Sequence, residues 1–234
     1  MTGLVAVEYC TGSHKYGGMK FPSRVLFDMV QNDSAAPRRP GRPRAYNPWT
    51  ALQAATNRFW RSGYSGTSLD EICAATGMNR PSLYAAFGDK HALYLEALAH
   101  YWRLAFADMH EALAEDLPLD EALMRVYDGA LSIYFSGDGH PRGCFVLGTA
   151  VTEAAEDSDV RNSLAAGFHK FDTDFEARLR TAIEQGELAA DADPAALAVI
   201  ATATMHTIAI RARSGTPRDD LRALARKAIT IICG

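Results

Sequence analysis

Apolar residues recur every three or four positions along most of the chain beyond residue 46, which is the period of an amphipathic helix. The clearest case is one face formed by Val160, Leu164, Phe168, Phe171, Phe175, Leu179 and Ile183. Only residues 143–151 alternate as a strand would, and that run is short and ambiguous. The pattern predicts an all-α fold with about nine helices.

Capping residues indicate where the first helices begin and end. An Asn or Ser before an apolar run can accept from the free amides of the first turn, and a glycine after the run can end it. Such residues predict helices over 48–62, 68–77 and 79–87, followed by a long helix from about residue 90. Glu71 follows Ser68 at capping-box spacing. Three short helices, with a tight glycine-containing turn between the second and the third, form a helix-turn-helix arrangement.

Prolines divide the rest of the chain at positions 118, 141, 194 and 217. Asp193 and Thr216 each precede one of these prolines. Each pair therefore predicts a capping residue followed by a proline at the first helical position. These two pairs open the last two predicted helices.

The net charge of −4 conceals an uneven distribution. Residues 37–91 carry eight basic and three acidic side chains, a balance of +5, whereas residues 92–234 carry 13 basic and 22 acidic ones, a balance of −9. A small basic module is suited to neutralising phosphates. The distribution favours nucleic-acid binding by the first of these regions and a separate role for the second.

Residues 1–45 lack a sustained helical period and end in a stretch rich in Arg and Pro, so we expect a disordered basic extension. Arg42 and Arg44 in this stretch resemble the arms that enter a narrow minor groove ahead of some helix-turn-helix domains. A solubilising tail is the alternative. Met29 opens a run typical of a translation start, and N-terminal sequencing would test whether residues 1–28 are translated.

The four cysteines, at positions 10, 73, 144 and 233, show no CxxC spacing, which argues against a zinc cluster and a disulfide scaffold. We expect no metal and no cofactor. The longest apolar stretch, residues 195–210, is largely Ala and Thr and is shorter than the roughly 20 residues of a membrane helix. The chain also begins without a secretory pattern. A cytoplasmic protein without membrane contact is expected.

The most informative motif comprises Gly63-Tyr64, Thr67-Ser68, Ile72-Cys73, Gly77-Met78, Ser82-Leu83-Tyr84, Phe87 and Lys90. It resembles the DNA-binding module of the TetR family, in which a Gly-aromatic bend, a Thr-Ser cap, Ile-Ala, Gly-Val, Ser/Thr-Leu-Tyr, Phe and Lys follow at these spacings. Cys73 departs from the usual alanine. The resemblance implies a one-component transcriptional repressor, with DNA binding in residues 46–92 and ligand binding and dimerisation in residues 93–234.

The docking geometry of helix-turn-helix proteins implies that the first turn of the third helix enters the major groove. Arg80 and Ser82 are therefore expected at base edges, where Arg80 can bond guanine O6 and N7. The remaining expected DNA contacts are Thr67, Ser68, Asn79, Tyr84 and Lys90. The alternatives are a core role for Tyr84 and a purely capping role for Ser68.

TetR-like proteins dimerise through their last two helices, for which the chain offers apolar faces at Leu197, Ile200, Ala201, Met205, Leu221, Leu224, Ala228 and Ile229. The alternative, which applies to about half of them, is that they close the core of the single chain. A homodimer is also expected because one recognition helix reads only a few base pairs of an operator. The family's ligand pocket lies among the middle helices. The resemblance implies a small apolar or amphipathic effector and walls formed by Trp102, Phe106, Tyr127, Cys144, Phe145, Phe168, Phe171 and His206, although each could instead be ordinary core.

The Gly143-Cys144 pair resembles one found in a subset of TetR-type regulators, some of which respond to electrophiles or oxidants at a cysteine near this point. Arg142 and a following helix N-terminus are expected to lower the pKa of this thiol, and a buried structural cysteine is the alternative. Ligand, or modification of Cys144, is expected to shift the dimer toward a state unable to bind DNA, with the long helix from Lys90 as the lever.

Two other functions remain open from the sequence. An activator or a ligand-independent DNA-binding factor could use the same module, because the effect on transcription depends on where the operator lies. A helical enzyme using Cys144 with His140 or His169 is more remote, because no nucleophile, base and orienting residue stand at a recognisable spacing. We therefore expect no enzyme.

Overall fold

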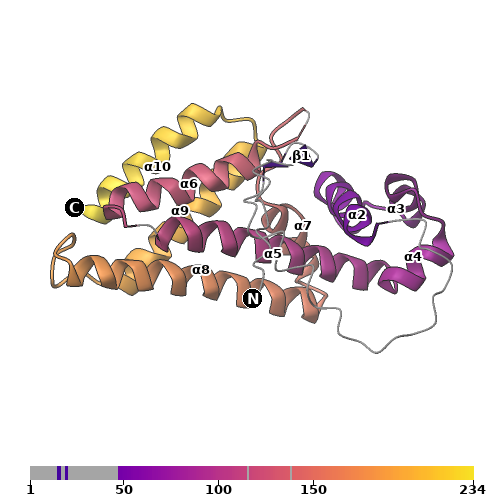
Figure 1. The fold of residues 1–234 in the computed structure, drawn as a ribbon, viewed down its shortest axis with the longest axis horizontal. Coiled ribbons are helices and arrows are strands. Elements are labelled where there is room, and N and C mark those ends of the chain that lie inside the picture. Colours follow the sequence, from indigo (N-terminus) through magenta and orange to yellow (C-terminus); the bar gives the residue numbers. More distant parts are fainter. Residues whose placement is uncertain (1–14, 17–18, 21–46, 115, 138) are drawn as a thin grey trace, which may run out of the picture. The chain divides into compact units, whose positions relative to one another are not determined.

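The structure is a computed structural model, and it describes residues 15–16, 19–20, 47–114, 116–137 and 139–234 (Figure 1). In these ranges the nine helices are α2 (Pro48–Ser62), α3 (Leu69–Thr76), α4 (Arg80–Phe87), α5 (Lys90–Ala114), α6 (Leu119–Tyr134), α7 (Phe145–Glu153), α8 (Ser158–Glu184), α9 (Pro194–Arg213) and α10 (Arg218–Cys233). The predicted all-α fold is confirmed. Two short strands, β1 (Lys15–Tyr16) and β2 (Met19–Lys20), pair antiparallel in the predicted N-terminal extension, most of which lies outside the described residues.

The predicted caps stand at the ends of the first three helices. Asn47 and Asn79 each accept backbone amides of the turn that follows, and Ser68 forms a capping box with Glu71. Gly77 ends α3 at a φ of +68°, a left-handed conformation that glycine adopts without strain. Local sequence therefore determines the helix-turn-helix.

The last two helices differ in how they begin. Asp193 caps α9 directly before Pro194, as predicted. Pro217 is itself the N-cap, with an extended ψ of 146°, so α10 begins at Arg218 without a side-chain cap. The predicted cap at Thr216 is therefore wrong, because the proline lies just outside the helix and not in its first turn.

The long helices form a bundle in which α5 packs against both α6 and α8 (Figure 1). Helix α9 packs against α6, α8 and α10. The ambiguous run at residues 143–151 belongs to helix α7 and not to a strand. Because α7 contacts α2 as well as α5, α8 and α9, it lies where the first helices meet the bundle.

An aromatic cluster joins the first helices to the bundle. Phe59 and Tyr94 have ring centroids 5.1 Å apart, and Trp60 lies 5.4 Å from Tyr101 and 5.5 Å from Phe145. All five side chains are buried. Residues from 47 onward belong to one compact unit, and the predicted boundary at residue 92 falls within α5. Helix α5 is therefore shared by the two functional regions.

Helix α9 is the only described helix that is long and apolar enough to cross a membrane, with a mean hydropathy of 1.5. It packs against the four helices α6, α7, α8 and α10, and 44% of its most apolar stretch is buried. Buried helices of globular proteins have the same composition. Its place in the bundle accounts for its apolar character.

Candidate DNA-binding surface and effector cavity

The turn between α3 and α4 presents the start of α4 at the surface. Arg80 is the first residue of α4 and is exposed, and Ser82, two residues further along, is half-buried. On the opposite face Leu83 and Phe87 are buried in the module's core. The helix thus has the arrangement that a recognition helix needs, with polar side chains at its N-terminal end and an apolar anchor behind them.

Tyr84 and Lys90 also lie at this surface. The Tyr84 side chain is 44% exposed, which excludes it from the core. Lys90 Nζ lies 4.3 Å from the centroid of the Tyr64 ring, and burial lowers the pKa of Lys90. Both side chains therefore remain candidates for phosphate contacts, which position a protein on DNA.

The residues at the start of α3 depart from the expected phosphate contacts. Thr67 is fully buried, and its hydroxyl donates to the Gly63 carbonyl oxygen at 2.6 Å, where it ties the end of α2 to α3. Ser68 is exposed, but its Oγ accepts from the Glu71 amide and lies 3.1 Å from Glu71 Oε2. Asn79 likewise caps its helix. Capping and packing account for the hydroxyls of Thr67 and Ser68.

Two further predicted DNA contacts, Arg42 and Arg44, lie outside the described residues. Their assignment to a minor-groove arm stays a prediction. The described module begins at Asn47, which caps α2, so such an arm would join the module directly before that helix.

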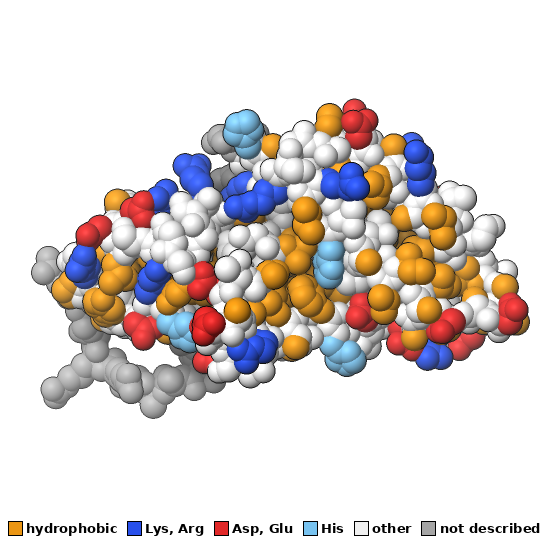
Figure 2. Space-filling model, turned by 180° about the vertical axis from the view of Figure 1, so that it is seen from behind, with side chains coloured by type: hydrophobic (Ala, Val, Ile, Leu, Met, Phe, Trp, Pro, Cys, Tyr) orange, Lys and Arg blue, Asp and Glu red, His pale blue; other side chains and the backbone are white. Residues whose placement is uncertain are grey.

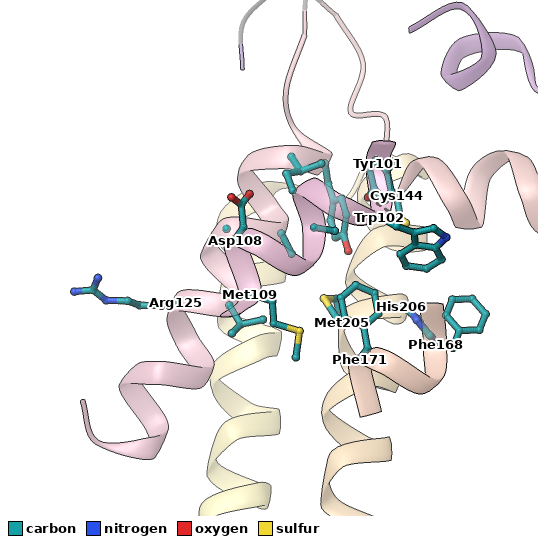
Figure 3. Close-up of a pocket in the computed structure, with 16 residues that line it drawn as sticks. Tyr101, Trp102, Asp108, Met109, Arg125, Cys144, Phe168, Phe171, Met205 and His206 are labelled. Atoms are coloured by element: carbon teal, nitrogen blue, oxygen red, sulfur yellow. Dashed lines mark hydrogen bonds between the residues drawn. The ribbon is translucent and has the colours of Figure 1, made fainter. Parts of the chain in front are cut away.

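A small cavity lies among α5, α6, α8 and α9, with Cys144 at its edge (Figure 3). Its volume is about 40 Å³, and its walls are mostly aromatic and aliphatic. The lining residues are Tyr101, Trp102, Ala105, Asp108, Met109, Arg125, Val126, Gly129, Ala130, Ile133, Tyr134, Cys144, Phe168, Phe171, Met205 and His206. Small-molecule sites usually measure roughly 300–1,000 Å³, so an organic ligand requires this cavity to expand.

The predicted effector walls divide into two groups. Those that line the cavity are Trp102, Cys144, Phe168, Phe171 and His206. Phe106 stacks on Trp102 with ring centroids 5.3 Å apart but does not line the cavity. Tyr127 and Phe145 are fully buried in the core, and Tyr127 Oη donates to the Ala201 carbonyl oxygen at 3.1 Å. Helical periodicity does not separate these two groups.

The cavity lining also includes the charged side chains Asp108 and Arg125, which were not among the predicted walls, and His206, which was. Burial, with a smaller contribution from Glu111, raises the pKa of Asp108 to about 6. His206 Nε2 is buried without a hydrogen-bond partner among the described residues, and burial lowers the pKa of His206. Arg125 extends away from the other lining side chains (Figure 3). Asp108 follows Trp102 and Ala105 at steps of three, and this helical phase could have revealed it.

Cys144 precedes α7 and lines both the cavity and a groove beside α9. Tyr101 Oη donates to its Sγ at 3.2 Å. Burial raises the pKa of the Cys144 thiol and outweighs the hydrogen bonds from Tyr101 and from the first amides of α7, which lower it. The expected lowering of this pKa is wrong, because the thiol is desolvated and the Arg142 guanidinium is directed toward α2.

Residues 142–145, here called the linking segment, connect the cavity with the DNA-binding module. The Arg142 guanidinium carbon lies 4.2 Å from the Trp60 ring centroid, and Nη1 donates to Asn57 Oδ1 at 2.8 Å. Gly143 has a φ of +65°, and a Cβ there would stand 2.5 Å from the Ala209 carbonyl oxygen of α9. The linking segment thus contacts α2, α9 and the cavity within four residues.

One cluster offers possible metal ligands. His91, Asp157 and Asp159 bring one nitrogen and two carboxylate oxygens within 4.8 Å of one another. Asp157 caps α8 through the amides of Asp159 and Val160, and its other oxygen lies 2.6 Å from His91 Nε2. Capping and the His91 contact account for Asp157 without a metal.

Three short helices, the third with polar side chains at its exposed N-terminal end, define a helix-turn-helix DNA-binding protein. Residues 51–97 match the family model described as "Bacterial regulatory proteins, tetR family", and residues 121–229 match "Tetracyclin repressor-like, C-terminal domain". The chain belongs to the TetR family of DNA-binding transcriptional repressors.

Individual relatives agree with this assignment. The transcriptional repressor ComR of Escherichia coli K12 is 30% identical over 187 residues, which are 79% of this chain and 88% of ComR. The repressor BdcR of the same organism is 38% identical over 110 residues, 47% of this chain and 55% of BdcR. A cysteine variant of the TetR family regulator CifR, solved with 26-base-pair operator DNA, has a TM-score of 0.74 and 35% identity, covering 81% of this chain and 98% of that one.

Proposed function

We propose that the chain represses transcription as a homodimer on operator DNA in the cytoplasm, and that a small amphipathic molecule entering the cavity releases it. The linking segment carries this proposal. Cys144 lines the cavity, and two residues earlier Arg142 binds Asn57 and Trp60 of α2. A change in cavity shape therefore reaches the DNA-binding helices directly.

The surface of α4 supports operator binding. Arg80 is exposed at the first helical position, and Tyr84 is exposed one turn later. A guanidinium in this place can form two hydrogen bonds with a guanine, whereas a phenol hydroxyl can contact a phosphate. The similarity to CifR, which was solved on operator DNA, supports the same use of this surface.

Exposed apolar side chains on the last two helices support a homodimer. Val199, Ile200 and Ile210 of α9 are 56%, 42% and 61% exposed, and Ile231 of α10 is 72% exposed. Figure 2 shows one face of the molecule on which hydrophobic side chains gather over the helical bundle. Four residues expected in the interface lie instead in the chain's own core: Ala201, Met205, Leu221 and Ile229. We expect Ile200→Glu to yield a monomer in sedimentation velocity, and an unchanged dimer would remove α9 from the interface.

The size of the cavity supports release by a population shift. At about 40 Å³ the cavity excludes an organic effector, so such a molecule binds only a conformer in which α5, α6, α8 and α9 have moved apart. A ligand shifts an equilibrium by its differential affinity for the two states. If the expanded conformer holds the recognition helices at a spacing that does not match two major grooves, the ligand lowers operator affinity.

A bulky side chain in the cavity can stand in for the unidentified effector. Gly129 of α6 lines the cavity, and a Cβ there would meet no atom within 4 Å. We expect Gly129→Phe to lower operator affinity about tenfold or more, within the usual range of allosteric coupling. Fluorescence anisotropy with a duplex selected from a random library by the wild-type protein would measure this.

Two further variants distinguish coupling from general damage. Ala166→Phe adds the same ring on the exposed face of α8 and should leave operator affinity unchanged. Adding Arg142→Ala to Gly129→Phe should restore much of the lost affinity, because the contact with Asn57 and Trp60 is then absent. A folded Gly129→Phe protein with wild-type operator affinity would refute release through the cavity.

A thiol-reactive signal is a second candidate, because Cys144 lies between the cavity and the outer groove. Its raised pKa leaves the thiol mostly protonated at neutral pH and slows attack on an electrophile. If Cys144→Ser keeps full derepression by such compounds, this candidate fails. We assign no catalytic activity, since His140 and His169 are exposed whereas Tyr101 is the side chain bonded to Cys144.

A further inference from the structure

The basic DNA-binding module contains three acidic side chains between residues 47 and 91, and two of them have structural roles. Glu71 completes the capping box of α3 and pairs with Arg58. Asp89 accepts from the Ala92 amide at the start of α5. Asp70 also lies in the first turn of α3, but among the described residues it accepts no backbone amide, and its side-chain hydrogen bonds are to Arg80 alone.

The contact between Asp70 and Arg80 crosses from α3 to the first residue of the recognition helix. Asp70 Oδ1 accepts from Arg80 Nε at 3.1 Å and from Nη2 at 2.8 Å. The Asp70 and Arg80 side chains are 77% and 54% exposed, and exposed ion pairs contribute little to stability. Folding therefore gains little from a carboxylate that DNA phosphates would repel.

The hydrogens that Asp70 leaves free are those that a guanine requires. A guanidinium carries five N–H donors in a planar fork. Asp70 occupies the edge formed by Nε and Nη2, so the outer edge, formed by Nη1 and the second Nη2 hydrogen, remains available. Two parallel donors on that edge match O6 and N7 of guanine. Arg80 held by one edge also loses less side-chain freedom when it docks.

We infer that Asp70 is a positioning residue that fixes the Arg80 guanidinium so that its outer edge reads a guanine in each operator half-site. This inference rests on the proposed base contact of Arg80. It predicts that Asp70 contributes to sequence specificity and not to overall affinity, because its own charge opposes the phosphates. A carboxylate that only favours the first turn of α3 would change stability without changing base preference.

Selection from a random-sequence duplex library, read by sequencing, tests the inference with the full-length protein. Four proteins are compared: wild type, Arg80→Ala, Asp70→Ala and the double variant. We expect the wild type to prefer guanine over adenine at one position of each half-site by about tenfold or more, and Arg80→Ala to abolish this preference. Asp70→Ala should reduce it to about twofold at that position alone.

Asp70→Asn and the double variant provide the controls. An amide oxygen can still accept from Arg80, so Asp70→Asn should give an intermediate preference. Adding Asp70→Ala to Arg80→Ala should change the selected sequence no further, and thermal melting verifies that each variant is folded. An undiminished guanine preference in folded Asp70→Ala overturns the positioning role. If Arg80→Ala retains that preference, the proposed base contact fails first and the inference fails with it.

Discussion

The DNA-binding module and the effector cavity share helix α5 and one compact unit, yet their functional side chains lie in opposite surroundings. In the module, Arg80 and Tyr84 point outward from short helices whose ends are fixed by caps. In the cavity, side chains from four long helices face inward and also belong to the core. Function and stability should therefore be separable in the module and coupled in the cavity.

Arg80→Ala should have the largest effect and act on DNA binding alone. A dimer loses one bidentate base contact in each half-site, and at about 1–3 kcal/mol for each contact the operator affinity should fall about 30-fold or more. The melting temperature should not change, because Arg80 is exposed. Arg103→Ala on the exposed side of α5 is the matched control. Equal losses in both variants would indicate general electrostatics and not base recognition.

Asp108→Asn should act on stability in the cavity, with a dependence on pH. Burial raises the pKa of Asp108 to about 6 from 3.8, so its charged form destabilises the folded protein at pH 7. The amide should stabilise the protein by about 1–2 kcal/mol there, allowing for partial exposure.

This advantage should shrink as the pH falls from 6 to 4, because the folded wild type gains a proton before the unfolded chain does. Thermal melts between pH 4 and 8 would record the trend. Asp191→Asn, which replaces an exposed carboxylate by an amide, is the matched control variant. A difference between wild type and Asp108→Asn that did not vary with pH would contradict the assigned pKa.

Gly129→Ala should stabilise the cavity region while leaving operator binding intact. The methyl group meets no atom within 4 Å, and alanine favours a helix interior by about 1 kcal/mol over glycine. The melting temperature should rise by roughly 2–4 °C for a chain of this size. Calorimetry measures the shift. A lower melting temperature would mean that the added methyl group clashes with a neighbouring side chain of the cavity wall.

Removing the hydroxyl of one tyrosine in each region allows the two regions to be compared directly. Tyr84→Phe should weaken operator binding a few-fold without a change in melting, because the hydroxyl is exposed. Tyr127→Phe should lower stability by about 1 kcal/mol, since its hydroxyl donates to the Ala201 carbonyl oxygen in the core. Its operator affinity should be unchanged. The reverse pattern would assign each tyrosine to the other region.

These contrasts explain how much the sequence alone could predict. Helix ends at Asn47, Ser68 and Asn79 depend on hydrogen bonds within one turn, so local residue types determine them. The cavity wall depends on how distant helices face one another. Helical spacing selects Tyr127 as readily as Phe171, although only Phe171 reaches the cavity.

Burial produced the other departures from the sequence-based expectations. Arg142 was expected to activate the neighbouring thiol, but its guanidinium lies on the Trp60 ring and the desolvated sulfur of Cys144 is harder to ionise. Thr67 was expected to face a phosphate, and its hydroxyl is instead buried against Gly63. The direction of Arg142 cannot be derived from residue order, because it depends on packing against α2, which is far away in the chain. The Thr67 hydrogen bond spans only four residues, but whether the hydroxyl faces solvent or the bend after α2 depends on how that bend packs.

The close passage of Gly143 past α9 limits which side chains the linking segment can carry at this position. Gly143 has a positive φ, and a Cβ at this position would lie 2.5 Å from the Ala209 carbonyl oxygen, so no residue with a side chain fits there without a shift of the backbone. A larger residue would move the linking segment away from α9 and carry Arg142 with it. If the proposed release operates, a saturation screen should find substitutions at Gly143 among the repressors that remain on DNA in the presence of inducer.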